Sequence, residues 1–287
     1  MKDIPYLSPK THKTTFEINL KAFKENLAFY RSKLKPETKL IVMVKAFAYG
    51  LGLSKIAEVL ADEGIEYLAV AYTDEAVMLR EAGYEGKLMV FNPEPDCFDN
   101  IIRYKLEPEL YSLPIIEEFL NTIKKNAAYQ LLEPFPVHLK IDTGMNRLGL
   151  KPDEIEIAAN LIANNNRLKV HSAFSHLAAA DEGDHDAFTL QQFNDFLKHA
   201  NLLETHLGYS FDKHISNSAA IERFPTFQLD AVRLGIGLYG YSPQPEIQKQ
   251  LKTVCTLKSR IAQIKEVLPG ETVGYGRKGI VESPTKI

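Results

Sequence analysis

The sequence predicts an α/β fold, a (β/α)8 TIM barrel followed by the start of a β-rich C-terminal domain. Eight short apolar runs rich in branched residues recur along the chain, and most gaps between them show the three-, four- and seven-residue spacing of an amphipathic helix. Strands that alternate with helices favour a parallel sheet, because a parallel crossover is long and a helix fills it best. Eight such units make a barrel.

The predicted strands follow from the apolar runs, and the predicted helices follow from the helical spacing of the gaps between them. Ser112 and Thr73 stand where helix N-caps are expected. The apolar runs that we interpret as strands are 39–46, 67–72, 87–92, 106–111, 136–142, 168–177, 214–220 and 231–240. Helical spacing is clearest in two sets of residues: Ile116, Phe119, Leu120 and Ile123, and Phe193, Phe196, Leu197 and Ala200.

An open, doubly wound sheet is the competing architecture, but no GxGxxG follows an early strand, which favours the barrel. From about residue 250 the pattern changes to strand-like alternation, with a turn signal at Pro269-Gly270. We therefore expect a barrel over residues 14–248 and an incomplete β-domain over residues 249–287.

Composition excludes several function classes. The chain has 287 residues, of which 45% are hydrophobic and 25% charged, as in ordinary globular proteins, and its formal net charge is −3. No block of Lys and Arg suggests nucleic acid as a partner. The first twenty residues hold no continuous apolar segment and no later stretch is long enough for a bilayer, so we expect a cytoplasmic protein. Cys97 and Cys255 have neither metal-ligand nor redox spacing, and we expect no metal.

Lys45 is the first residue that suggests chemistry. It ends the first strand in VKAFAYGLG, and reactive side chains of a barrel lie at the carboxyl ends of its strands. An apolar wall there would lower the pKa of its amine and make it a better Schiff-base nucleophile. Taken alone, however, a lysine at a strand end is usually a solvated surface charge.

Two further groups of polar residues follow later strands. KIDTGMNRLG carries Lys140 and Arg147, and is either a tight loop with an arginine on its rim or a fixed guanidinium that binds a carboxylate. Backbone amides at Gly235 and Ile236, together with the Ser218 hydroxyl, could bind a phosphate, as the seventh and eighth loops of barrels often do. His176 and Arg233 could equally be a buried structural pair.

In combination these segments resemble the pyridoxal 5'-phosphate (PLP)-dependent alanine racemases. VKAxAYGxG, DTGMNRLG, SHLAxAD, NSAA, VRxGIxLYG and a late VGYG occur in the order in which that family carries them. The match runs from about residue 14 to the end of the chain. The combination is highly specific, although each motif alone is not.

The resemblance implies a site for each part of the cofactor. Lys45 resembles the lysine that holds PLP as a Schiff base, and Arg233 the arginine at the pyridine nitrogen, with His176 behind it. Arg147 resembles the arginine near the substrate carboxylate, and Lys140 the lysine that steadies it and is carbamylated in some members. The residues expected around the cofactor phosphate are Tyr49, Ser218, Gly235 and Ile236, and Asn217 is expected among the cofactor-binding residues.

The resemblance also implies the reaction. Tyr275, in VGYGR, resembles the tyrosine base that a partner subunit lends to the site, so a homodimer with a shared active site is expected. Lys45 would then take the α-proton of D-alanine and Tyr275 that of L-alanine, supplying D-alanine for peptidoglycan. The alternatives are a non-catalytic PLP-binding barrel, or a related amino-acid racemase or decarboxylase.

Three departures from the family pattern stand out. Phe47 occupies a position where Asn or Asp is common, and Leu51 one where His is common. The family's β-domain normally continues well past the TKI at which this chain stops. The sequence style also resembles versions in which the racemase follows a peptidoglycan-precursor ligase, so we expect a C-terminally shortened chain that could be part of such a fusion.

Overall fold

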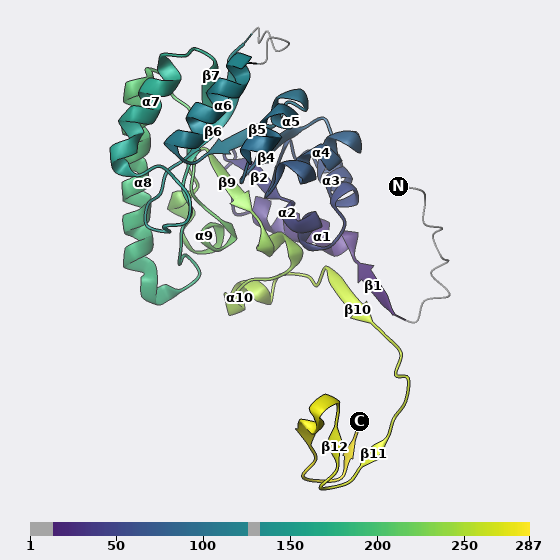
Figure 1. Cartoon of the computed structure of the whole chain (residues 1–287). Helices are drawn as coiled ribbons and strands as arrows, with labels where there is room; N and C mark the ends of the chain where they lie inside the picture. Colours follow the sequence, from purple (N-terminus) through teal and green to yellow (C-terminus); the bar gives the residue numbers. More distant parts are fainter. Residues whose placement is uncertain (1–13, 126–132) are drawn as a thin grey trace. The chain divides into compact units, whose positions relative to one another are not determined.

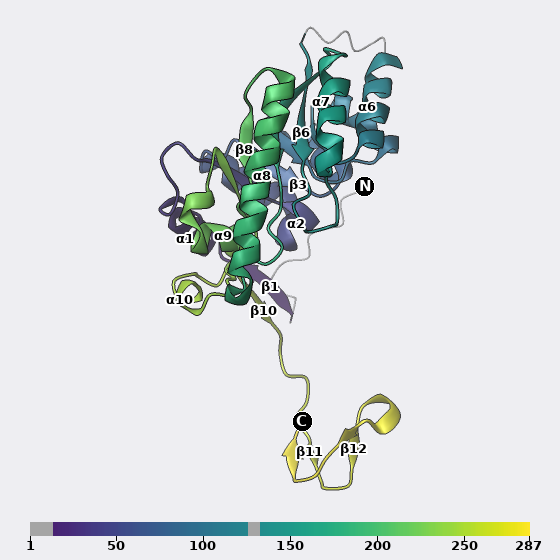
Figure 2. The same cartoon turned by 90° about the vertical axis from the view of Figure 1, so that its left-hand side faces the viewer.

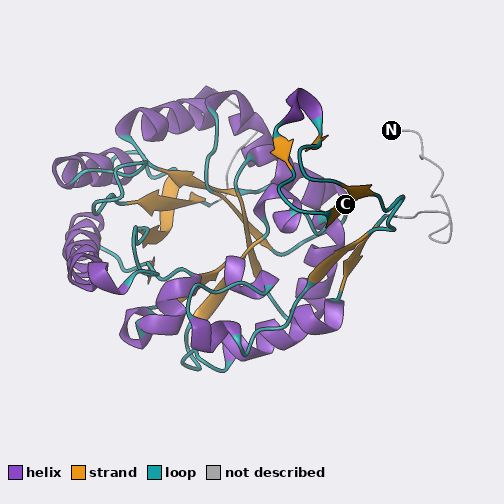
Figure 3. Cartoon of the chain, turned by 90° about the horizontal axis from the view of Figure 1, so that it is seen from below, coloured by secondary structure: helices purple, strands orange, loops and turns teal. Residues whose placement is uncertain are grey.

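Eight parallel strands close into a barrel in the computed structural model, which describes residues 14–125 and 133–287. Each strand pairs with the next along the chain, and β2 closes the ring on β9 with Ile41 opposite Arg233. Figure 3 shows this ring of strands inside a ring of helices. The predicted TIM barrel is confirmed. Its strands are β2 (Lys39–Met43), β3 (Tyr67–Val70), β4 (Lys87–Val90), β5 (Glu107–Leu110), β6 (Phe135–Lys140), β7 (Leu168–Phe174), β8 (Asp212–His214) and β9 (Ala231–Leu234).

Helices cover the outside of the barrel (Figure 1 and Figure 2). The predicted apolar stripe of α6 is confirmed, because Ile116, Phe119, Leu120 and Ile123 are all buried. No helix in the described part of the chain is both long and apolar enough to span a bilayer. The helices are α1 (Leu20–Arg31), α3 (Leu53–Asp62), α4 (Thr73–Glu81), α5 (Phe98–Arg103), α6 (Leu113–Lys125), α7 (Ile155–Ala163), α8 (Asp186–Leu207), α9 (Ser218–Arg223) and α10 (Pro245–Gln248).

Three sequence predictions about elements are wrong. The run 214–220 is not a strand beyond His214, because the Asn217 side chain accepts the Ala220 N–H at 3.0 Å and starts α9. The run 231–240 leaves the sheet after Leu234, and the short 3-10 helix η6 (Ile236–Tyr239) follows. Thr73 is the first residue of α4 rather than its N-cap, which is the residue before it.

The described residues divide into two compact units by their contacts. Asn19–Val254 forms the barrel unit, and Cys255–Ile287 belongs to a second unit together with β1 (Thr15–Ile18). In the second unit β1 pairs antiparallel with β10 (Cys255–Lys258), a pairing that the sequence did not predict. The other strands there are β11 (Glu266–Val267), β12 (Thr272–Val273), β13 (Gly279–Ile280) and β14 (Thr285–Lys286). The domain limits 14–248 and 249–287 stay a prediction.

Gly149 is the residue at which the loop after β6 returns to its strand. Its φ is +133°, and a Cβ there would lie 2.5 Å from the backbone nitrogen of Asp142. That backbone is fixed on both sides, because Asp142 donates its N–H to Leu150 O at 3.0 Å and Leu150 donates to Lys140 O at 2.8 Å. No flexible side chain can move to make room.

We therefore expect Gly149→Ala to lower the free energy of unfolding by about 2 to 4 kcal/mol, from backbone strain and overpacking together. Denaturant unfolding measures this loss. Gly208→Ala is the matched control: Gly208 also has a positive φ, +75°, but nothing lies within 4 Å of a Cβ there. The control should lose only about 1 kcal/mol, and equal losses in the two variants would contradict the packing argument.

Candidate active site

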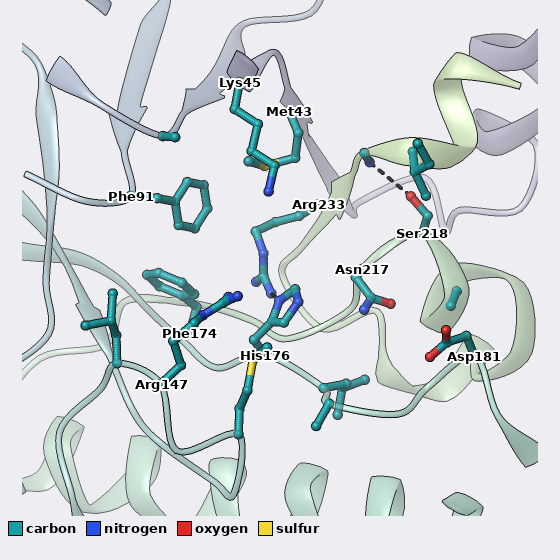
Figure 4. A pocket seen from close by; sticks show the side chains of 18 of the residues that line it. Met43, Lys45, Phe91, Arg147, Phe174, His176, Asp181, Asn217, Ser218 and Arg233 are labelled. Atoms are coloured by element: carbon teal, nitrogen blue, oxygen red, sulfur yellow. Dashed lines mark hydrogen bonds between the residues drawn. The ribbon is translucent and has the colours of Figure 1, made fainter. Parts of the chain in front are cut away.

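A cavity of about 550 Å³ opens at the carboxyl ends of the barrel strands. It is the expected place for chemistry in this fold, and its lining mixes apolar walls with converging polar groups (Figure 4). Tyr275 belongs to the other unit, on whose surface it is exposed. All the other residues that the sequence suggested for the site line this cavity: Lys45, Tyr49, Lys140, Arg147, His176, Asn217, Ser218, Arg233, Gly235 and Ile236.

Lys45 leads into a left-handed turn. The segment labelled α2 (Lys45–Tyr49) is not a right-handed helix, because residues 46–49 all have φ between +52° and +54°. Gly50 and Gly52 continue with φ of +87° and +97°, which glycine adopts readily. The left-handed conformation costs roughly 1–2 kcal/mol at each of residues 46–49, which are not glycines. Strain of this kind persists only where the surroundings enforce it, and it is concentrated at functional sites.

Glu75 on α4 enforces the turn. Its Oε1 accepts the Phe47 N–H at 3.3 Å, while its Oε2 accepts the N–H groups of Ala71 and Tyr72 at 2.9 and 3.3 Å. The carboxylate thus caps α4 and binds the Lys45 turn to the neighbouring β3–α4 loop. The sequence analysis missed this residue, because it placed the N-cap at Thr73, whereas the capping-box spacing of three residues to Glu75 starts from Tyr72.

The Lys45 amine is available for reaction. Among the described residues its Nζ has no hydrogen-bond or ion-pair partner, and the cavity side of the residue is exposed. Burial against the cavity walls lowers its pKa, the positive charge of Arg147 lowers it further, and Glu75 acts in the opposite direction. The neutral, nucleophilic form of the amine is therefore more populated at neutral pH than in a free lysine.

Arg233 on β9 is held rigidly. One terminal nitrogen donates to His214 Nδ1 at 2.8 Å and to His214 O, and the other donates to Ser175 O at 2.7 Å, to Ile215 O and to His176 Nδ1 at 3.2 Å. Burial lowers the pKa of Arg233 to about 10, so the guanidinium stays charged at neutral pH. The cavity floor therefore carries a fixed cation that cannot readily give up a proton.

The histidines around Arg233 have defined tautomers. Because a guanidinium can only donate, Nδ1 of both His176 and His214 must accept, and any proton is on Nε2. Burial and the charge of Arg233 hold the pKa of both imidazoles well below the usual range. Both rings are therefore neutral, and His176 offers an Nε2–H donor at the cavity.

A chain of hydrogen bonds continues below Arg233 through the barrel interior. His214 Nε2–H donates to Ser172 Oγ at 2.9 Å, and Ser172 Oγ is hydrogen-bonded to His138 Nδ1 at 2.7 Å. His138 Nε2–H then donates to Glu107 at 3.0 Å. Burial opposes ionisation of Glu107, but hydrogen bonds from His138, His171 and Tyr67 outweigh it and hold its pKa well below the usual range. A carboxylate thus ends the chain.

The sequence analysis missed this interior chain as well. Its signal is polar residues two apart on predicted strands, since alternate residues of a barrel strand face the interior. Glu107 and Glu109 share a face of β5, and His138 and Lys140 share a face of β6. Such pairs on otherwise apolar runs indicate a polar barrel interior.

Ser218, Gly235 and Gly237 form a small polar recess. Ser218 Oγ accepts the N–H groups of Gly235 and Gly237 at 3.0 and 3.3 Å, so its own hydroxyl proton is free to donate elsewhere. A Cβ on Gly235 would lie 2.9 Å from Tyr49 Oη and would fill the space between them. The Tyr49 ring is held by Tyr239, with ring centroids 4.3 Å apart. These groups suit an anion with several acceptor oxygens.

Arg147 and Lys140 complete the cationic lining. The loop that carries Arg147 is shaped by Asp142, whose Oδ1 accepts the N–H groups of Gly144 and Asn146 at 3.0 and 3.1 Å. Lys140 on β6 is buried, and its Nζ lies 3.2 Å from Glu109 Oε1 on β5. The cavity therefore combines one reactive amine with three further cations, an arrangement suited to a ligand that carries a carbonyl and anionic groups.

The chain is similar to alanine racemases in sequence. The model of the family described as "Alanine racemase, N-terminal domain" matches residues 18–243. "Alanine racemase 1" of Oceanobacillus iheyensis is 34% identical over 275 residues, which cover 94% of this chain and 72% of that protein. The alanine racemase of Clostridium novyi is 37% identical over 277 residues, which cover 91% of this chain and 67% of that protein.

Solved structures are similar as well. An alanine racemase of Clostridium difficile 630 superposes with a TM-score of 0.83 at 32% identity. The match covers 96% of this chain and 72% of the racemase chain. The alanine racemase of D-cycloserine-producing Streptomyces lavendulae gives a TM-score of 0.86 at 28% identity, with the same coverage. This chain thus matches a little under three quarters of each of these structures.

We expect Glu75→Ala to lower the free energy of unfolding by about 2 kcal/mol or more, because three backbone N–H groups lose their acceptor. Amide hydrogen exchange should also become faster at Phe47, Ala71 and Tyr72. Denaturant unfolding and exchange mass spectrometry measure the two effects. Glu81→Ala is the control on the same helix, since Glu81 accepts an exposed bond from the Tyr104 hydroxyl and caps no backbone N–H group in the described part of the chain. Unchanged exchange at Phe47 would show that Glu75 does not hold the turn.

Proposed function

We propose that this chain, which belongs to the alanine racemase family, interconverts L-alanine and D-alanine with PLP as its cofactor and so supplies D-alanine for peptidoglycan. One observation carries the proposal. A lysine amine with a lowered pKa and no bonded partner among the described residues lines the same cavity as a rigid, charged arginine. A reactive amine and a non-acidic cation are the two groups that a PLP racemase needs.

The residues present fit PLP in each of its parts. Lys45 would bind its carbonyl carbon covalently, and Arg233 would donate to its ring nitrogen. The Ser218 hydroxyl and the backbone around Gly235 and Ile236 would hold its phosphate, with Tyr49 and Asn217 beside them. The space that a Cβ on Gly235 would fill supports this assignment, because the glycine lets an anion approach the backbone.

Two bases on opposite faces of the substrate carry the proton. PLP, when bound, supplies a conjugated system that delocalises the electron pair left on Cα. Lys45 Nζ removes the α-proton of D-alanine and returns a proton on the same face, while the Tyr275 hydroxyl serves the L-alanine face. The lowered pKa of Lys45 favours the neutral amine that this step requires.

Arg233 sets how strongly the cofactor ring would withdraw electrons from Cα of the substrate. It stays charged, with a pKa of about 10, and its five hydrogen bonds keep it from moving toward or away from a ring nitrogen. An arginine donates a hydrogen bond there without transferring its proton, so electron withdrawal stays moderate. This favours return of a proton to Cα, and thus racemisation, over transamination. His176, neutral and bonded to Arg233, is a positioning residue.

Arg147 binds the substrate carboxylate, and Lys140 supports that side of the cavity. A guanidinium holds a carboxylate by paired hydrogen bonds, which fixes the Cα–H bond relative to the two bases. The second base belongs to the other unit of the chain, and we propose that it reaches the cavity from a partner subunit. The protein would then act as a homodimer in which each site uses Lys45 of one subunit and Tyr275 of the other.

Borohydride reduction of the PLP-loaded protein followed by peptide mapping should place the pyridoxyl group on Lys45, because Lys45 alone combines a strand-end position with a free amine in the cavity. Lys45→Ala should lower racemisation by about a hundredfold or more. Lys140→Arg is the control, since it keeps a cation in the same cavity and should still be labelled at Lys45. A pyridoxyl group on Lys140 of the unaltered protein would refute the assignment.

Tyr275→Phe should slow exchange of the α-proton of L-alanine by roughly a hundredfold and that of D-alanine much less, because only the L face loses its base. Solvent deuterium incorporation, followed separately for each enantiomer, measures both rates. Tyr104→Phe, at a partly exposed tyrosine of the barrel unit that lies outside the lining of this cavity, is the control. Equal losses for the two enantiomers would contradict the two-base division, and a PLP-binding protein without exchange on either face would favour the non-catalytic alternative.

A further inference from the structure

Glu109 is a buried carboxylate among the cations of the cavity. It lies on β5, lines the cavity and has no solvent exposure. The charges that act on it are those of Lys140, Arg233 and Arg147. Of the other acidic side chains in the described lining, Glu222 is engaged by the hydroxyls of Tyr30 and Ser242.

Neither oxygen of Glu109 has a hydrogen-bond partner in the described part of the chain. Lys140 Nζ lies 3.2 Å from its Oε1 and is its ion-pair partner. A buried carboxylate is costly unless charges or hydrogen bonds compensate it. Burial raises the pKa of Glu109 to about 7, and the three cations oppose that rise.

We propose that Glu109 is the resident counter-anion of Lys140, Arg147 and Arg233, and that it keeps Lys140 an unmodified ammonium. Its role is that of a positioning residue, which holds the floor of the site without touching the substrate. The inference rests on the proposed function for the roles of Arg147 and Arg233. It does not need that function for the state of Lys140.

The alternative state of Lys140 follows from amine chemistry. Burial lowers the pKa of its amine, and Arg147 and Arg233 lower it further, whereas Glu109 raises it. Without Glu109 the amine would lose its proton more easily. A neutral lysine amine then adds CO2: an N–C bond forms, one C=O π bond of CO2 opens and its electron pair stays on oxygen, the N–H proton passes to solvent, and a carbamate anion results.

A carbamate on Lys140 would compete with Glu109 for the same position. The new anion would lie beside an existing buried carboxylate, and two such charges a few ångströms apart repel strongly. The Glu109 carboxylate therefore provides the negative charge that a carbamate on Lys140 would otherwise provide. The ion pair and the carbamate exclude one another, which makes the state of Lys140 a direct test.

The full chain is equilibrated with ¹³C-labelled bicarbonate at mildly alkaline pH, and carbamate is observed by ¹³C NMR. We expect no carbamate resonance from the unaltered protein and a stoichiometric resonance from Glu109→Gln. Glu109→Gln combined with Lys140→Arg should lose it again, which assigns the signal to Lys140. Glu109→Asp, which retains an anion, should show none.

A Lys140 carbamate in the unaltered protein would overturn the proposal, and this arm requires no variant to fold. Absence of the resonance from a folded Glu109→Gln would also overturn it, because another group would then be protecting the amine. Racemase activity is not used as a readout. A protein without that activity but with the expected resonances would contradict the proposed function and leave the role of Glu109 standing.

Discussion

Eight parallel strands that close into a barrel direct alternate side chains into one narrow interior and bring all their carboxyl ends to one rim. Every feature of the site depends on that closure. Lys45 and Arg233 are far apart in sequence, yet Lys45 follows directly after β2 and Arg233 lies on β9, and the pairing of these two strands closes the ring. The same geometry brings Glu109 on β5 next to Lys140 on β6. The barrel thus determines which charges meet.

A buried charge is stable only when hydrogen bonds or opposite charges compensate it, and in the barrel interior a chain of hydrogen bonds does so for Arg233. Arg233 can only donate, and this sets the tautomer of His214, whose Nε2–H donates to Ser172, which is hydrogen-bonded in turn to His138. The chain ends on the Glu107 carboxylate. A cation on one side of the barrel interior is in this way connected to the Glu107 carboxylate through hydrogen-bonded side chains, and these bonds hold Arg233 in place.

Backbone strain is concentrated beside Lys45. Four consecutive residues with φ near +53° would be unfavourable in isolation, and the Glu75 carboxylate compensates by accepting N–H groups from the turn and from the loop beside it. The reactive lysine therefore begins a short turn whose conformation is stabilised by Glu75 on the neighbouring helix α4. At Gly235 and Gly149 the lack of a side chain instead lets neighbouring segments approach closely.

The sequence by itself determined what depends on local periodicity and on motifs: the alternation of strands and helices, the apolar stripe of α6, and Lys45, Arg147 and Arg233 as cavity residues. Tertiary structure decided what depends on neighbours across strands. Residues 215–220 left the sheet because Asn217 caps a helix, and Glu75, Glu107 and Glu109 acquired partners only when distant segments met. An alternating pattern shows which side chains face inward. Only closure of the barrel decides which of them touch.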